Sequence, residues 1–180
     1  YHVSRSPIRE ATVRLERDGL VERDGLVVRV RRRGVQEILD IYRVRVHLEA
    51  AIAQDAAHRR QDVDLLTLDA VLAAELSAHD CDGAAMVRLN RAFHTALAVA
   101  AHNQTLHELQ DRLTAQVAHL PSTTLLQKGR WAQAREEHRT LVDAVRRGDG
   151  DQARAIAESH MATARDLRLA LFKQQAADQF

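Results

Sequence analysis

Three histidines and one asparagine occupy positions that should face the interior of a helical protein. His94, His138 and His160 each have apolar residues three, four or seven positions away, which is the spacing of the buried stripe of an α-helix. Asn90 lies one helical turn before His94 on the same side. Imidazole nitrogens and an amide oxygen on facing helices suit a divalent transition metal and leave positions for a ligand oxygen. The spacing is equally compatible with core histidines that only form hydrogen bonds.

One arginine also stands on an apolar helix face. Arg45 has Ile38, Ile41, Leu48 and Ile52 at helical spacing around it. A guanidinium is almost never buried without a negatively charged partner, so Arg45 needs an anion. Two anions remain open at this point: the carboxylate of Glu49, one turn further along, or a carboxylate of a bound ligand held between Arg45 and a metal.

The elements that would position these side chains are helices. Beyond Gly34 the apolar period is helical almost to the end of the chain, with breaks near Gly83, Asn103, Pro121 to Gly129, and Gly148 to Gly150. The pattern predicts six helices, at 35–59, 62–80, 83–101, 104–120, 130–147 and 150–176.

The N-terminal segment differs from the rest. Residues 4–18 have the apolar period of one short helix, which tolerates Pro7 in its first turn and ends at Gly19. Two β-prone stretches follow on either side of Asp24-Gly25, a dipeptide typical of two-residue hairpin turns. A short helix followed by a hairpin is half of a winged helix unit.

Composition limits the class of protein. The chain has 180 residues, 46% of them hydrophobic, and a single cysteine, so no internal disulfide can form. No apolar stretch approaches the length needed to span a bilayer, and we expect a soluble protein of the reducing cytoplasm with no membrane partner. Residues 1–33 hold nine arginines against five acidic residues. Arginine suits phosphate and guanine contacts, although a solvated charged surface is the alternative.

The N-terminal sequence resembles a known DNA-binding unit. The stretch "VSRSPIREATVRLERDGLV" with its hairpin is similar to the second half of the winged helix-turn-helix of the GntR family of bacterial transcription regulators. The resemblance implies a recognition helix whose first residues enter the major groove of operator DNA, and a wing beside the backbone or minor groove. By position, it implies DNA contacts at Ser4, Arg5, Ser6, Arg9 and the wing tip from Arg23 to Gly25. Earlier helices of a complete unit would precede residue 1.

The resemblance extends over the rest of the chain. The segments "EILDIYRVRVHLE", "LNRAFHTALAVAAHNQTL" and "EEHRTLVDAVRRGDGDQARAIAESHM" look like the ligand-sensing FCD domain of FadR-like GntR regulators. That family implies a helical bundle whose cavity holds a divalent metal, with an organic-acid effector nearby. By position, the ligands would be Asn90, His94, His138 and His160, and Arg45 would contact the effector.

The sequence departs from the family at one ligand position. Asn90 stands where the family often has Asp, so the site loses a negative charge. Three histidines and a neutral amide still suit zinc or nickel, with manganese, iron or cobalt also possible, and they disfavour magnesium and calcium.

These expectations combine into one prediction. The chain should be mainly all-α, with a partial winged helix-turn-helix at 1–33 and a six- to seven-helix antiparallel bundle at 34–180. It should be a homodimeric repressor whose effector weakens operator binding. A metal-free sensing or dimerisation module is the alternative. A metal-dependent enzyme is disfavoured, because neither HExxH nor a Glu-x-x-His pair places a general base beside the histidines.

Overall fold

The protein is mainly helical, as predicted. The computed structural model describes residues 5–78, 82–118, 120 and 122–178, without the side chain of Arg5. Its elements in this part of the chain are α1 (Arg5–Arg17), β1 (Val21–Asp24), β2 (Val27–Val30), α2 (Val35–Arg59), α3 (Asp62–Ser77), α4 (Gly83–Ala100), α5 (Gln104–Val117), the 3-10 helix η1 (Thr124–Leu126), α6 (Arg130–Arg147) and α7 (Gly150–Ala177). Every predicted helix is present, and each boundary agrees to within one turn. Only η1 was not predicted.

The helix ends carry the capping residues that the breaks in the sequence suggested. Asp82 accepts a hydrogen bond from the backbone of Ala85 at the start of α4, and Asp149 accepts one from Gln152 at the start of α7. α6 ends at Gly148, whose φ of +72° is in the left-handed region that glycine adopts without strain. These caps fix where each helix begins and ends.

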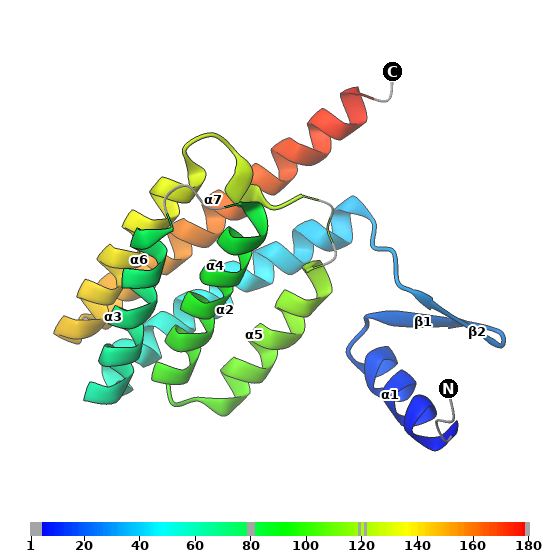
Figure 1. Ribbon diagram of the computed structural model, residues 1–180, viewed down its shortest axis with the longest axis horizontal. Coiled ribbons are helices and arrows are strands. Elements are labelled where there is room, and N and C mark those ends of the chain that lie inside the picture. Colours follow the sequence, from blue (N-terminus) through cyan, green and yellow to red (C-terminus); the bar gives the residue numbers. More distant parts are fainter. Residues whose placement is uncertain (1–4, 79–81, 119, 121, 179–180) are drawn as a thin grey trace.

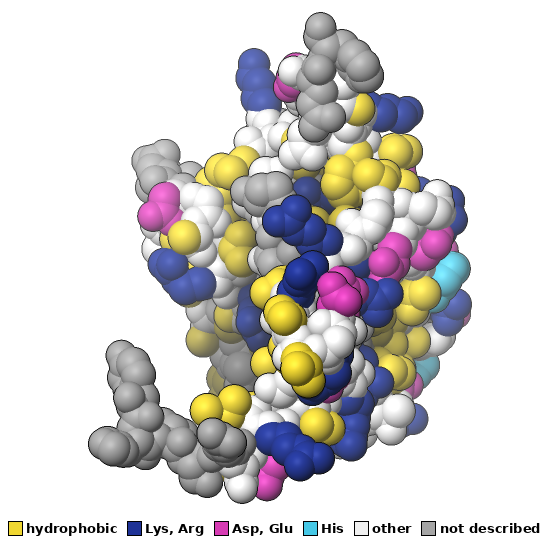
Figure 2. Space-filling view, turned by 90° about the vertical axis from the view of Figure 1, so that its right-hand side faces the viewer, with side chains coloured by type: hydrophobic (Ala, Val, Ile, Leu, Met, Phe, Trp, Pro, Cys, Tyr) yellow, Lys and Arg dark blue, Asp and Glu magenta, His cyan; other side chains and the backbone are white. Residues whose placement is uncertain are grey.

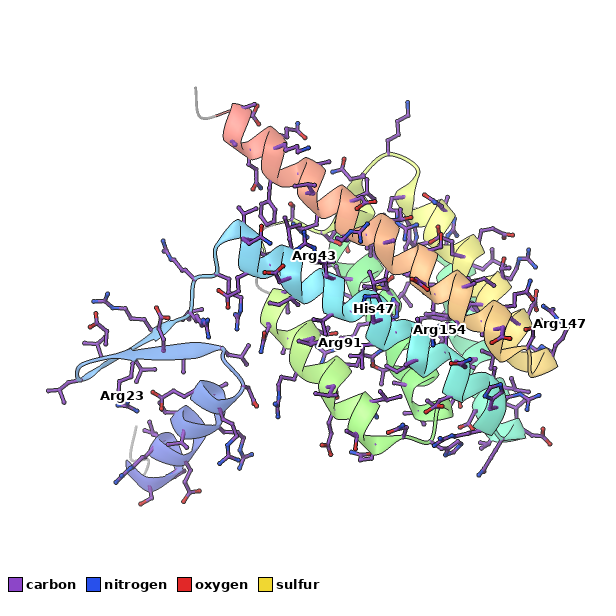
Figure 3. All side chains as sticks on the ribbon, turned by 180° about the vertical axis from the view of Figure 1, so that it is seen from behind. Arg23, Arg43, His47, Arg91, Arg147 and Arg154 are labelled. Carbon is purple, nitrogen blue, oxygen red and sulfur yellow. The ribbon has the colours of Figure 1, made fainter. Side chains whose placement is uncertain are left out.

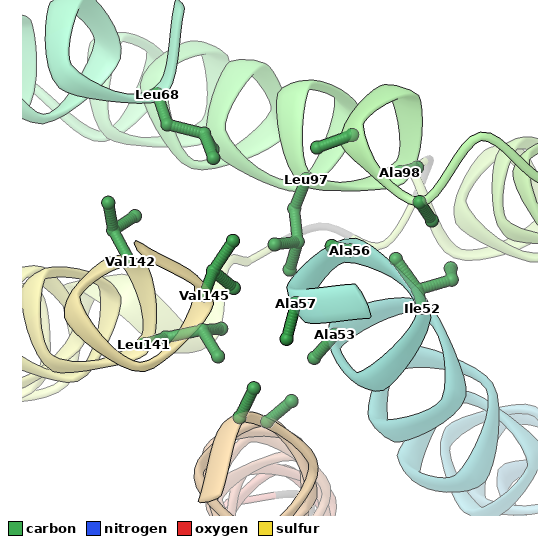
Figure 4. Packing of buried hydrophobic residues seen from close by; sticks show 14 of the residues in the cluster. Ile52, Ala53, Ala56, Ala57, Leu68, Leu97, Ala98, Leu141, Val142 and Val145 are labelled. Carbon is green, nitrogen blue, oxygen red and sulfur yellow. The ribbon is translucent and has the colours of Figure 1, made fainter. Parts of the chain in front are cut away.

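α2 to α7 form a bundle around one main core (Figure 1). The two longest helices, α2 and α7, pack along each other, and α2 also packs against α4, α5 and α6. α3 packs against α4 and α6. Small residues line the centre: Ala53, Ala56 and Ala57 of α2 are at most 1% exposed, beside Leu97 and Val145 (Figure 4). Alanine allows close approach of helix backbones at the centre of the bundle.

The segment 5–33, which we call the head, lies apart from the bundle (Figure 1). Its strands pair antiparallel from Val21 opposite Val30 to Asp24 opposite Val27, and Gly25 turns the chain with a φ of +61°. This is the predicted hairpin. The apolar side chains of α1, such as Ile8, are largely exposed, so the described part of the head has little core of its own.

The head is attached to the bundle through the end of α5. The Gln116 side chain donates a hydrogen bond of 3.0 Å to the backbone carbonyl of Asp18. The guanidinium of Arg33 donates to the carbonyls of Gly19 and Gln116, and its Nε lies 3.3 Å from Oε1 of Glu37. Since the Arg33 side chain is only 1% exposed, this attachment is a buried polar contact. None of the described helices is both long and apolar enough to cross a membrane.

Candidate metal and effector site

Three histidines from three different helices meet inside the bundle. His94 of α4, His138 of α6 and His160 of α7 are 8%, 1% and 5% exposed. They can offer ring nitrogens that all lie within 4.8 Å of one another. The Phe93 ring stacks on the His138 ring with a centroid distance of 3.7 Å, which holds that imidazole in place. The residues that the apolar period places inward therefore converge on one point.

Each of these histidines has a carboxylate at its Nδ1 atom. The pairs are His94 with Glu49 at 3.0 Å, His138 with Glu75 at 2.9 Å and His160 with Glu137 at 2.6 Å. A carboxyl group that accepts from Nδ1–H leaves the lone pair of Nε2 available to a cation. At His160, Nη2 of Arg130 also lies 3.2 Å from Nδ1. The Nδ1 contacts thus leave the Nε2 atoms for a shared ligand.

Two polar atoms at this site lack a partner. Nε2 of His138 and Oδ1 of Asn90 are buried and have no hydrogen-bond partner within the described part of the chain. A buried polar atom without a partner costs about 1–3 kcal/mol. A cation would satisfy both atoms, because a ring nitrogen and an amide oxygen are metal donors. The residues present therefore fit a divalent transition metal.

The protonation states also suit cation binding. Burial lowers the pKa of His138 well below its ordinary value, and the charges of His160 and His94 lower it further. Burial likewise lowers the pKa of His160, so both imidazoles are neutral near pH 7. Burial raises the pKa of Glu75 to about 8 against the opposing charge of Arg135. The contact of Glu75 with His138 is therefore a neutral pair.

Arg45 forms an ion pair with Glu49, one of the two anions that the sequence allowed. Its Nη2 lies 3.1 Å from Oε1 of Glu49, and both side chains are buried. Burial alone would raise the pKa of Glu49. Contacts from His94, Arg45 and Gln110 outweigh burial and lower that pKa well below its ordinary range. Glu49 is therefore ionised, and it contacts both Arg45 and His94. Nε of Arg45 has no hydrogen-bond partner among the described residues.

A cavity of about 450 Å³ adjoins the cluster, between α2, α4, α5, α7, Leu120 and the segment 122–126. Four of the five predicted site residues line it: Arg45, Asn90, His94 and His160. Its size suits a small organic molecule. Figure 3 shows that Arg43 and His47 lie on the outer side of α2, so Arg45 is the arginine that this helix turns inward.

Sequence reasoning missed several residues here. Glu75 has Leu68, Val71 and Leu72 at helical spacing, so the test used for the histidines would have found it. Arg168 has the apolar residues Met161 and Ala164 seven and four positions before it, so the same test would have found it. Arg130 and Glu137 have mixed neighbours and gave no such signal, although they pair at 2.7 Å beside His160.

The residues expected to contact DNA are on the head. Ser4 and the side chain of Arg5 lie outside the described residues. Arg9 is exposed on α1. Arg23 lies in β1 and points towards α1, where its guanidinium makes two contacts of 3.1 and 3.3 Å with Glu16 (Figure 3). Figure 2, which faces this side of the molecule, shows more Lys and Arg than Asp and Glu side chains.

Comparison with known proteins agrees with this architecture. The FCD domain model matches residues 40–163. The transcriptional regulator LutR of Bacillus subtilis is 26% identical over 97% of this chain and 89% of its own length. The galactonate operon transcriptional repressor of Escherichia coli is 31% identical over 67% of this chain, which spans 52% of that protein.

Solved structures show the same fold. E. coli McbR/YncC has a TM-score of 0.75 at 20% identity, covering 97% of this chain and 82% of its own. Streptococcus agalactiae GntR has a TM-score of 0.64 at 22% identity, covering 91% and 82%. The relatives are named transcription regulators, so the chain is a regulator rather than an enzyme. With an FCD domain over most of its length, it belongs to the FadR-like subfamily of the GntR transcription regulators.

Proposed function

We propose that this protein is a transcriptional repressor whose bundle, residues 34–180, binds a divalent transition metal and a small organic-acid effector. Residues 1–33, which include the head, belong to a winged helix-turn-helix that binds operator DNA. Binding of the effector releases the operator. A regulator acts where the DNA is, so we propose the cytoplasm as its compartment.

The observation that carries the proposal is the state of the histidine cluster. Three buried rings have Nδ1 engaged by carboxylates, while Nε2 of His138 and Oδ1 of Asn90 have no partner in the described chain. Most buried polar atoms in folded proteins have a hydrogen-bond partner, so two unpaired metal donors beside the other histidines favour a bound cation. Zinc or nickel suits three nitrogens and a neutral oxygen best, with manganese, iron or cobalt as further candidates. The bound ion would supply a positive charge to an effector oxygen.

The effector is proposed to be an organic acid. Arg45 lines the cavity beside the cluster, and Glu49 neutralises it through only one of its nitrogens. A carboxylate between Arg45 and the cluster would receive two positive groups. Relatives are named for a galactonate operon and, as a putative assignment, an L-lactate dehydrogenase operon, which supports an acid as ligand here.

α5 is the proposed route from the cavity to the head. Thr114 and Val117 line the cavity, while Gln116 of the same helix binds the backbone at Asp18. An effector that binds more tightly to one placement of α5 therefore shifts the placement of the head. In a homodimer, two heads would then leave the spacing of a two-fold symmetric operator.

The DNA contacts follow from the position of each residue on the head. Arg5, Ser6 and Arg9 are in the first turns of α1, and Ser4 precedes Arg5 in the sequence. Arg23 and Asp24 end β1 and lead into the turn at Gly25. We assign the first group to the major groove and the second to the wing.

The test combines ligand and DNA binding. Protein loaded with zinc or nickel should enrich one palindromic sequence from a pool of random duplexes, and an organic acid that raises its melting temperature should release that duplex. The acid should have no such effect on the variant with His138→Ala and His160→Ala. Equal responses of both proteins to the acid would overturn the proposal.

A further inference from the structure

We propose that the effector cavity has a second anion-binding position, formed by Arg168 and Ser122, and that the effector is an organic acid with two acidic groups. This inference rests on the proposed function and names its ligand class. One acidic group would lie at Arg45 and the histidine cluster, and the other at Arg168.

Arg168 is a buried cation that has no acidic partner among the described residues. Its side chain on α7 is 4% exposed and lines the cavity. Nη2 donates a hydrogen bond of 2.7 Å to the backbone carbonyl of Ser122, and Nε is buried with no partner in the described chain. No Asp or Glu of the described residues forms an ion pair with it, in contrast to Arg45 with Glu49 and Arg130 with Glu137. A buried guanidinium with no counter-ion is unfavourable unless an anion binds there.

The hydroxyl of Ser122, next to Arg168, also has no hydrogen-bond partner among the described residues. Oγ of Ser122 is buried and has no hydrogen-bond partner within the described ranges, and Ser122 lines the same cavity. The backbone carbonyl of this residue already holds the guanidinium, so the hydroxyl and the cation are neighbours. A guanidinium N–H and a hydroxyl in one buried place are the donors that bind a carboxylate or a phosphate group.

The two cationic positions lie close enough for one small molecule. The Cζ atoms of Arg45 and Arg168 lie 5.8 and 6.0 Å from the centroid of the same ring, that of Tyr42. The Tyr42 and Phe172 rings attract the Arg168 cation through cation–π contacts. These ring contacts do not replace a hydrogen bond from the guanidinium to an oxygen. Tyr42 lines the cavity and provides an apolar wall between the two cations. A short diacid spans this arrangement, with an acidic group at each end.

The inference is tested by matched pairs of ligands on zinc-loaded protein. Calorimetric titration would compare dicarboxylates of four to six carbons with the monocarboxylates of the same chain length, and with phosphoglycerates as the phosphorylated counterparts. The wild type should bind its best diacid at least about tenfold more tightly than the matched monoacid. Whether the dicarboxylates or the phosphoglycerates give this preference identifies the second acidic group.

Three variants separate this position from a general loss of folding. Arg168→Gln should lower the preference for the diacid to about onefold and leave the affinity for the monoacid unchanged. Ser122→Ala should reduce the preference in part. Arg165→Gln removes an arginine of the same helix that pairs with Asp166 and should behave as wild type.

The outcomes distinguish this inference from the proposed function. A monoacid that binds as tightly as the diacid, or a diacid preference that persists in Arg168→Gln, overturns the second anion position alone. No binding of any acid to metal-loaded wild type overturns the proposed function and this inference with it. A melting curve of each variant confirms that a lost preference does not come from unfolding.

Discussion

Each site histidine has a glutamate carboxyl group beside its Nδ1 atom. The carboxylates at Nδ1 come from α2, α3 and α6, whereas the histidines come from α4, α6 and α7. Because both members of each pair are held by packed helices, the rings cannot turn freely to find other partners. The cluster is therefore arranged for a ligand before one arrives.

The carboxylate at His138 should control metal affinity. Glu75→Gln keeps the size of the side chain but removes the charge that favours a metal-bound imidazole, so we expect zinc affinity to fall about 10- to 100-fold. Competition with a chromophoric chelator measures this directly. Glu136→Gln, at an exposed position on α6, should leave the affinity unchanged. Equal affinities of the Glu75 variant and wild type would contradict the role of this pair.

Metal affinity should also rise with pH between about 6 and 8. Burial raises the pKa of Glu75 to about 8, so below that pH Glu75 is protonated in the metal-free protein. A metal at Nε2 of His138 needs Nδ1–H to donate to ionised Glu75, so binding releases this proton and affinity falls roughly tenfold per unit of pH below 8. His138 and His160 add little competition there because their pKa values are lowered. Calorimetry in two buffers of different ionisation enthalpy measures the number of protons released on metal binding. If no proton is released at pH 7, the role given to Glu75 is contradicted.

The apolar period predicted which histidines are buried because burial is a local property of a helix face. It could not predict which carboxylate meets which histidine, since Glu75 and His138 are 63 positions apart and meet only through helix packing. The same limit applies to Arg130, whose neighbours in sequence are mixed although its side chain is 3% exposed. The apolar period of a sequence therefore identifies the buried face of a helix. The residue that this face contacts on another helix is known only from the packing.

The bundle depends on a core shared by several helices. Leu97 of α4 is fully buried with Ile52 of α2 and Val142 of α6 (Figure 4). Leu97→Ala should lower the free energy of unfolding by about 2–5 kcal/mol, because it removes buried methyl groups and leaves a cavity. Urea unfolding measures this change. Leu66→Ala, at a position of α3 that is 69% exposed, should cost less than about 0.5 kcal/mol; similar costs for both variants would contradict this packing.

Helix boundaries were predictable because caps and glycines mark them in the sequence. Asp82, Asn103 and Asp149 accept backbone hydrogen bonds at the starts of three helices, and Gly148 ends another. The short helix η1 was not predicted, although Thr123 caps it, because three residues are too few to show a period. η1 and the two residues before it nevertheless line the cavity that is the proposed effector site.

At the scale of the whole molecule, the head depends on its attachment to α5. Gln116→Ala removes the 3.0 Å hydrogen bond to the carbonyl of Asp18 and leaves the contact of Arg33 with the backbone carbonyl of residue 116. We expect faster backbone amide exchange in the segment 18–33, with little change in the bundle. Hydrogen exchange read by mass spectrometry provides the comparison. Gln104→Ala, at the other end of α5 where the side chain bonds only to Glu108 of its own helix, is the control.

Hydrogen exchange in the presence of effector tests whether α5 transmits effector binding from the cavity to the head. Wild type should show a change of exchange in the head when an organic acid binds, and Gln116→Ala should lose that change while its affinity for the acid remains. A Gln116 variant whose head still responds to the acid would show that the signal travels by another path.

The central claim is that the histidine cluster holds a metal, and elemental analysis of protein purified without an affinity tag tests it most directly. Wild type should contain about one transition metal ion per chain, and the variant with His138→Ala and His160→Ala should contain none while still unfolding cooperatively. Wild type that remains free of metal after incubation with zinc or nickel and desalting, or a variant that holds as much metal as wild type, would contradict the account.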